Sequence, residues 1–63
     1  MPDLGGLTAR EKEVAALVFE GLTNAEIAAR LYLSEVNVKK HLKSIFEKQD
    51  VSSRTQLVRK MLI

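Results

Sequence analysis

Residues 23–49, TNAEIAARLYLSEVNVKKHLKSIFEKQ, decide the fold of this chain. Two helix starts are legible in this stretch. Thr23 with Glu26 forms a capping box, in which the hydroxyl accepts from a backbone N–H and the carboxylate accepts from the N–H of the cap itself. Ser34 is the next N-cap. The pattern predicts a helix of about two turns after Thr23 and a longer helix that begins after Ser34 and ends near Gln49.

The two predicted helices are separated by a tight connection, Tyr32-Leu33, and together they form a helix-turn-helix pattern. Ala28 is small where the helices would cross closely, and Leu33 can fill the turn. Val38 can meet the short helix from the long one. Many such motifs have glycine in the turn, so Tyr32 is a departure from the common pattern.

A first helix is predicted before this motif. Thr8 with Glu11 is another capping box, and it opens a helix that runs to about Phe19 or Glu20, where Gly21 stops it. The residues before it, 1–6, are turn-like and are predicted to be an N-terminal tether or linker. The domain itself is predicted to span residues 7–63.

A last helix follows the motif. Ser53 with Gln56 reads as a further capping box, and the helix extends to about Met61, with Leu57 one turn earlier on the core side. No stretch shows the alternation of a β-strand. The predicted fold class is therefore all-α, a four-helix bundle-like domain with a central helix-turn-helix. Since the 63 residues include no Cys and one His, aliphatic packing must hold this fold together.

The long helix after Ser34 separates two faces on a wheel of about 100° per residue. The apolar stripe consists of Val38, Leu42, Ile45 and Phe46. The other face carries Lys39, Lys40 and Lys43 together with Val36. Lysines on a helix are often merely solvated. The separate apolar stripe and the short helix before it favour instead a helix that lies in the major groove of DNA, where Lys can bind guanine, Asn37 adenine and Val36 a thymine methyl.

Charge is unevenly distributed along the chain. The formal net charge is +2, but Lys and Arg outnumber Asp and Glu only from Ser34 onward. This distribution is typical of a protein with a polyanionic partner. The longest apolar run, residues 14–19, is far shorter than the ~20 residues of a membrane span, so we expect no membrane partner and a cytoplasmic location.

Four stretches resemble, in order and at fitting spacing, the LuxR/NarL/FixJ (GerE-like) family of helix-turn-helix domains. They are LTAREKEV (7–14), GLTNAEIA (21–28), LSEVNVKKH (33–41) and VSSRTQ (51–56), and the resemblance covers about residues 7 to 60. It implies a bacterial transcriptional regulator, a member of the class that includes response regulators, which binds double-stranded DNA sequence-specifically with its third helix.

The resemblance also implies which residues meet DNA. The base-reading candidates carried over by position are Lys39, Lys40 and Lys43, and the wheel and side-chain chemistry add Val36 and Asn37. The phosphate-contact candidates are Thr23, Asn24, Ser34, Glu35, His41 and Arg54. Glu35 can serve only through its backbone N–H, because DNA would repel its carboxylate. Two positions depart from the family, which usually has Thr at Asn37 and often an apolar residue at Lys40, so base preference is expected to differ there.

A homodimer on DNA, formed through the fourth helix, is the oligomer that the resemblance implies. The candidate contact residues are Thr55, Val58 and Arg59, since a two-fold interface uses one patch twice. The alternative is that Val58 is buried within its own monomer. Other implied partners are RNA polymerase and, if the chain is the C-terminal piece of a longer regulator, an upstream receiver or sensor domain.

Two other functions fit part of the pattern. A domain like region four of sigma factors has a similar first helix and motif, but the segment 52–57 argues against it. A small helical protein-interaction module would instead expose an apolar groove. An enzyme is not expected, because the sequence has no nucleophile–base set, no metal-ligand cluster and no Gly-rich phosphate loop. We therefore predict no cofactor and no metal, and His41 is interpreted as a packing or phosphate-contact residue.

Overall fold

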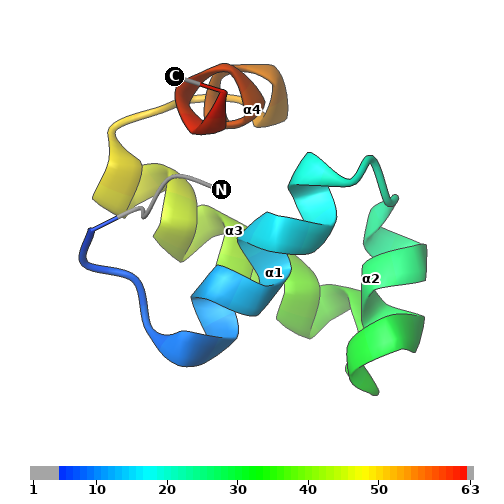
Figure 1. Ribbon diagram of the computed structural model, residues 1–63. Coiled ribbons are helices and arrows are strands. Elements are labelled where there is room, and N and C mark those ends of the chain that lie inside the picture. Colours follow the sequence, from blue (N-terminus) through cyan, green and yellow to red (C-terminus); the bar gives the residue numbers. More distant parts are fainter. Residues whose placement is uncertain (1–4, 63) are drawn as a thin grey trace.

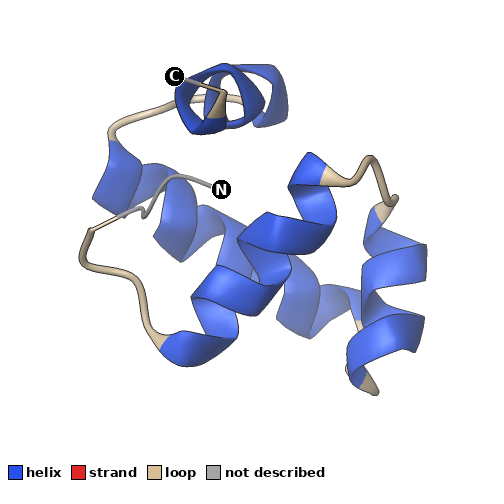
Figure 2. Cartoon of the chain, in the orientation of Figure 1, coloured by secondary structure: helices blue, strands red, loops and turns tan. Residues whose placement is uncertain are grey.

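The computed structural model describes residues 5–62, which form four helices joined by short connections (Figure 1). The helices are α1 (Ala9–Phe19), α2 (Asn24–Leu31), α3 (Glu35–Gln49) and α4 (Arg54–Met61). This part of the chain contains no strand (Figure 2). The all-α fold class and the predicted helix starts and ends are confirmed.

Local hydrogen bonds explain where the first two helices begin. The hydroxyl of Thr8 accepts from the Glu11 N–H at 3.1 Å, and the Glu11 carboxylate accepts from the Thr8 N–H at 2.9 Å. The same reciprocal pair joins Thr23 and Glu26, at 3.2 and 2.8 Å. Each cap satisfies backbone donors that a helix start otherwise leaves unpaired, and such a cap contributes about 1 kcal/mol.

The capping interaction of α4 differs from the prediction, although the helix begins where expected. Ser53 caps the helix, since its hydroxyl accepts from the Gln56 N–H at 3.2 Å. The Gln56 side chain, however, accepts from the backbone N–H of Ser52 at 2.7 Å and not from that of Ser53. Ser53 is more extended (φ −149°) than the caps Thr8 and Thr23 (φ −72° and −75°), and the Gln56 amide therefore reaches one residue further back. The reciprocal capping box predicted here is wrong.

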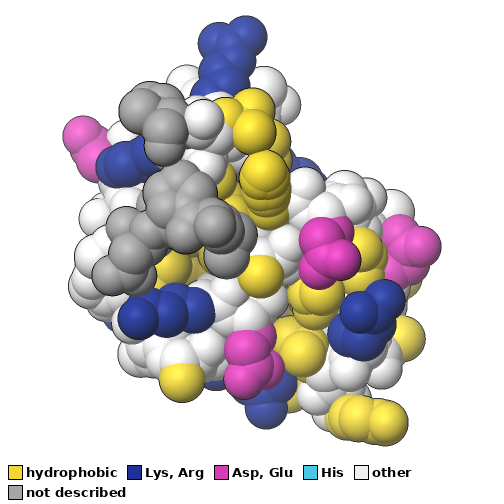
Figure 3. Space-filling model, viewed as in Figure 1, with side chains coloured by type: hydrophobic (Ala, Val, Ile, Leu, Met, Phe, Trp, Pro, Cys, Tyr) yellow, Lys and Arg dark blue, Asp and Glu magenta, His cyan; other side chains and the backbone are white. Residues whose placement is uncertain are grey.

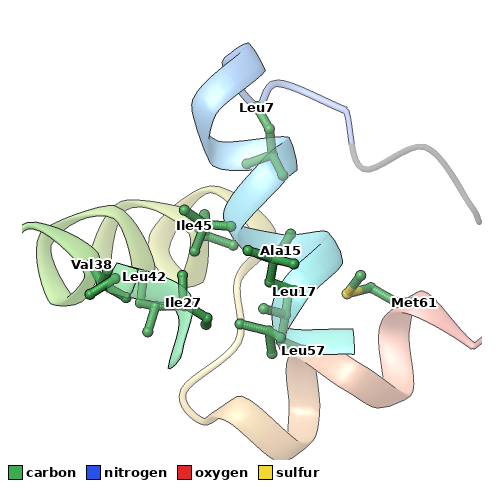
Figure 4. Packing of buried hydrophobic residues seen from close by; sticks show 12 residues of the cluster. Leu7, Ala15, Leu17, Ile27, Val38, Leu42, Ile45, Leu57 and Met61 are labelled. Atoms are coloured by element: carbon green, nitrogen blue, oxygen red, sulfur yellow. The ribbon is translucent and has the colours of Figure 1, made fainter. Parts of the chain in front are cut away.

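Apolar packing joins the four helices around one core. α1 crosses α3, α2 packs beside α3, and α4 packs against α1 (Figure 1). In Figure 4, Ile27 of α2 lies beside Val38 and Leu42 of α3, and Leu57 of α4 approaches Leu17 of α1. The largest fully buried side chains are Ile27, Ile45, Leu57, Met61, Val14, Val18 and Val38. As expected, Ala28 and Val38 are buried in the core, and Leu33 is half-buried in the turn.

One ion pair inside this fold was not predicted from the sequence. The Glu11 carboxylate, in a residue only 4% exposed, accepts from Lys48 Nζ at 2.7 Å and so joins the start of α1 to the end of α3. The hydrogen bond from Lys48, with smaller contributions from Ser44 and the Thr8 backbone, lowers the pKa of Glu11 from 4.5 to about 2, against the opposing effect of burial.

Further hydrogen bonds fix the end of α3. The buried Gln49 side chain donates to the Gly5 carbonyl at 2.8 Å, and Lys60 of α4 donates to the Gln49 carbonyl at 2.6 Å. Residues 1–4 of the predicted tether lie outside the described residues. Gly5, the next residue, is held against α3 by this bond.

Replacing Glu11 by Gln removes the charge but keeps an acceptor for the Thr8 N–H, so we expect the free energy of unfolding at pH 7 to fall by roughly 1–2 kcal/mol. Because the folded-state pKa is depressed, the carboxylate stabilises the fold above about pH 5, and this contribution is lost as the pH falls toward about 2. The variant should therefore lose less stability than the wild type over that range, as measured by denaturant unfolding.

The matched control is Glu13→Gln, which removes the carboxylate of an exposed ion pair with Arg10 at 3.3 Å. Exposed pairs contribute little, so its unfolding should follow the wild-type pH dependence closely. If the free energy of unfolding fell equally steeply with decreasing pH in the wild type and in Glu11→Gln, the Glu11 charge would have no stabilising role.

Candidate nucleic-acid interface

The two faces of α3 are separated as the wheel predicted. Val38, Leu42 and Ile45 are buried against the rest of the domain. The predicted base-reading residues are all exposed: Val36, Asn37, Lys39, Lys40 and Lys43. Val36 is 62% exposed. The helix therefore presents three cations and one apolar side chain to the exterior while its opposite side is immobilised.

The turn before α3 has an unusual backbone at Tyr32. This residue ends α2 in the left-handed conformation (φ 58°, ψ 41°), where glycine is the common choice. Its side chain is 96% exposed and gains nothing from burial. The turn is closed by the N–H groups of Tyr32 and Leu33, which both donate to the Ala28 carbonyl, the second at 2.9 Å. The backbone therefore fixes the direction in which α3 leaves α2.

The predicted phosphate-contact residues differ in their surroundings. Thr23, Ser34 and Glu35 are exposed at helix starts, where the Thr23 and Ser34 hydroxyls cap α2 and α3. Asn24, His41 and Arg54 are half-buried.

Three helix starts converge on one surface depression. The depression, of about 450 Å³, is lined by the residues Gly21, Leu22, Thr23, Asn24, Ala25, Glu35 and Arg54. A second depression, of about 490 Å³, is lined by Asn24, Lys39, Leu42, Lys43, Phe46, Glu47, Asp50, Val51 and Ser52. Asn24 thus connects the lysine face of α3 with the starts of α2 and α4. Ser34 and His41 line neither depression.

Arg54 joins the starts of two helices, a contact that the sequence did not reveal. Its Nη1 donates to Asn24 Oδ1 at 2.9 Å, and its Nη2 donates to the Leu22 carbonyl. The guanidinium of α4 is thereby held at the first residue of α2. Nothing in the local sequence signals this pair, because the two side chains are far apart along the chain.

Residues 6–61 match the family described as bacterial regulatory proteins, luxR family. The chain belongs to the luxR family. The resemblance predicted from the four motifs is confirmed, and the helix-turn-helix assignment with it.

Three relatives of this luxR-family domain illustrate the match. It is 47% identical over 55 residues to the probable transcriptional regulatory protein SgaR of Hyphomicrobium methylovorum. It is 48% identical over 50 residues to the transcriptional regulatory protein LiaR of Bacillus subtilis, and 50% identical over 52 residues to the response regulator Rre1 of Synechocystis sp.. The alignments cover 87%, 79% and 82% of this chain but only 26%, 24% and 22% of those proteins. Two of these names describe transcriptional regulatory proteins and the third a response regulator, which are the classes that the sequence predicted.

The fourth helix of the luxR-family domain has one exposed side. Thr55 and Arg59 are exposed, whereas Val58 is half-buried and packs against the core. The three residues border a depression of about 340 Å³, whose other walls include Val18 and Phe19 of α1. Val58 therefore contacts its own core, and part of its side chain still reaches the surface.

Charges on the face of the domain where α1 lies in front of α3 are mixed. Figure 3 shows acidic and basic side chains interspersed there, with apolar side chains between them. Within residues 5–62 no three His, Cys, Asp or Glu side chains are grouped so that they could hold a metal ion. None of the helices described is both long and apolar enough to cross a membrane.

Replacing Tyr32 by Gly should raise the free energy of unfolding by about 0.5–1 kcal/mol. The left-handed conformation costs an L-residue roughly 1–2 kcal/mol, part of which is offset by the greater freedom of glycine in the unfolded chain. Denaturant unfolding measures the change. Tyr32→Ala is the control, since alanine retains the Cβ and should give no comparable gain. Equal stabilisation by both substitutions would mean that the side chain of Tyr32, and not the backbone, is the cause.

Proposed function

We propose that this domain binds duplex DNA sequence-specifically, with α3 in the major groove, as a homodimer through α4. The observation that carries the proposal is the division of α3 into a stripe packed on the core, in which Val38 and Ile45 are fully buried, and an exposed lysine face. Because Val38 and Ile45 are completely buried, the helix cannot rotate without exposing the core. Lys39, Lys40 and Lys43 are thus offered to a partner in a fixed direction.

The chemistry of the exposed face fits base edges. Lysine ammonium groups donate to guanine O6 and N7, the Asn37 amide can pair with adenine, and the exposed Val36 can contact a thymine methyl. Lys40 and Asn37 are also the positions at which this chain departs from the family pattern. They are therefore the side chains through which its base preference would differ from that of its relatives.

Phosphate contacts are proposed beside this face. The candidates are Thr23 and Asn24 at the start of α2, Ser34 and the backbone N–H of Glu35 at the start of α3, His41, and Arg54 at the start of α4. Support comes from the convergence of three helix starts on one depression that Arg54 borders. Helix starts and guanidinium groups both favour phosphate oxygens. Such contacts supply affinity that falls with salt.

The homodimer is proposed to form through Thr55, Val58 and Arg59 of α4. The exposed side of α4 and the partly accessible Val58 support a self-complementary contact. Two half-sites would then lie about one helical turn of DNA apart, or a multiple of it. We further propose that the domain, comprising residues 7–63 with 1–6 as its tether, works in the bacterial cytoplasm within a longer regulator. There a receiver or sensor domain would control it, and RNA polymerase would be a further partner.

Replacing Lys40 by Ala should change the preferred bases or weaken binding to the preferred duplex by about 1–3 kcal/mol, because a donor to a base edge is lost. The preferred sequence is first selected from a random DNA pool, and affinities are then compared at fixed salt. Arg10→Ala is the control, since it removes a charge of the same sign from an exposed ion pair on α1. Unchanged affinity and preference in Lys40→Ala would contradict the assignment of this face to the groove.

Replacing Thr55 by Gln should weaken binding to paired half-sites and leave binding to a single half-site unchanged. The substitution adds bulk to an exposed position of α4 without altering its charge, so the phosphate attraction and the core are both preserved. It is preferable to a change at Val58, which also packs in the core. Band-shift titration of duplexes with one and two half-sites separates the effects, and an equal loss on both duplexes would argue against a dimer through α4.

A further inference from the structure

We propose that Asn24 acts on DNA binding through Arg54: it is a positioning residue that holds the guanidinium toward a DNA phosphate, and not itself a phosphate ligand. The proposal rests on the proposed DNA binding and gives a different role to one residue of the phosphate set. It predicts that a neutral side chain controls how much charge the domain brings to DNA.

The hold on Arg54 is bidentate. Two different nitrogens of the guanidinium donate to two acceptors, Nη1 to Asn24 Oδ1 at 2.9 Å and Nη2 to the Leu22 carbonyl. A planar guanidinium bonded at two points keeps one orientation, whereas a single bond would leave it free to turn. Both Asn24 and Arg54 are half-buried, which limits competition by water.

Both acceptors are themselves fixed. Asn24 is the first residue of α2, directly after the reciprocal cap formed by Thr23 and Glu26. The backbone of Leu22 is bonded to the end of α1, since its N–H donates to the Leu17 carbonyl at 3.2 Å. The orientation of Arg54 is therefore set by α1 and α2 and not by its own helix.

The remaining donors of the guanidinium have no acceptor among the hydrogen bonds found within residues 5–62, and Arg54 borders the depression where the helix starts converge. Glu35 lines the same depression, so a guanidinium released by Asn24 has a competing carboxylate within the site. Holding the side chain in advance lowers the entropy lost when a phosphate binds, and it keeps the charge available to DNA.

The test uses the salt dependence of affinity, because the slope of log affinity against log salt reports cations that meet phosphates. The 63-residue domain is titrated with its selected duplex at several salt concentrations. Arg54→Ala should flatten the slope by about one and weaken binding to all sequences alike. Asn24→Ala should also flatten the slope, although it removes no charge, and the double variant should bind no more weakly than Arg54→Ala.

The opposite pattern would overturn the proposal. If Asn24 contacts phosphate directly, Asn24→Ala weakens binding several-fold with the wild-type slope, and weakens it again in the Arg54→Ala background. A wild-type slope together with wild-type affinity in Asn24→Ala also overturns it. The matched control is Asn37→Ala, an exposed amide near the start of α3, which should alter base preference and leave the slope unchanged.

Thermal unfolding of each variant accompanies the titrations, because Arg54 also joins α4 to α2. If Arg54→Ala does not fold, Arg54→Gln provides the background, since glutamine retains a donor without a charge; Asn24→Ala should then leave the slope of that background unchanged. Failure of the proposed function has a different signature, namely a wild-type domain without salt-dependent, sequence-selective affinity. Failure of the positioning role requires that affinity to be present and its slope to be insensitive to Asn24.

Discussion

The burial of one stripe of α3 is the constraint on which the rest of the domain depends. A chain of 63 residues without cysteine has no disulfide to offset the entropy of folding and depends above all on apolar packing, to which α3 contributes Val38 and Ile45 with no exposed surface. In a regular helix, fixing one side fixes every other side. The direction of Lys39, Lys40 and Lys43 thus follows from the core. The burial that stabilises the fold also orients the basic face.

Polar contacts at the ends of helices fix how the helices that pack in the core are aligned. Lys48 and Gln49, in the last turn of α3, are bonded to Glu11 and to the Gly5 carbonyl. At the other side of the domain, Arg54 joins the start of α4 to the start of α2. Apolar burial has no direction, whereas these bonds do, so they set the register in which the four helices meet. The spacing between the lysine face and the converging helix starts depends on that register.

The positions at which this chain was expected to differ from its family lie on the surface of the domain. Asn37 and Lys40 lie on the exposed face of α3, so their side chains do not affect the packing of the core. Tyr32 departs from the glycine common in such turns and adopts the left-handed backbone that the turn requires. Since its side chain is almost wholly exposed, the cost is confined to the backbone and the geometry of the motif is kept.

The sequence by itself determined the helices, their starts and the two faces of α3, because capping and periodicity act between residues three or four positions apart. Thr8, Thr23 and Ser34 cap as predicted for this reason. Only the tertiary structure decided which charged side chains bond to other helices of the domain. Arg54 meets Asn24, and Lys48 meets Glu11, through the angles at which helices cross, and no local pattern encodes those angles. The half-burial of Val58 has the same origin, since one side of α4 meets α1 and the other meets solvent.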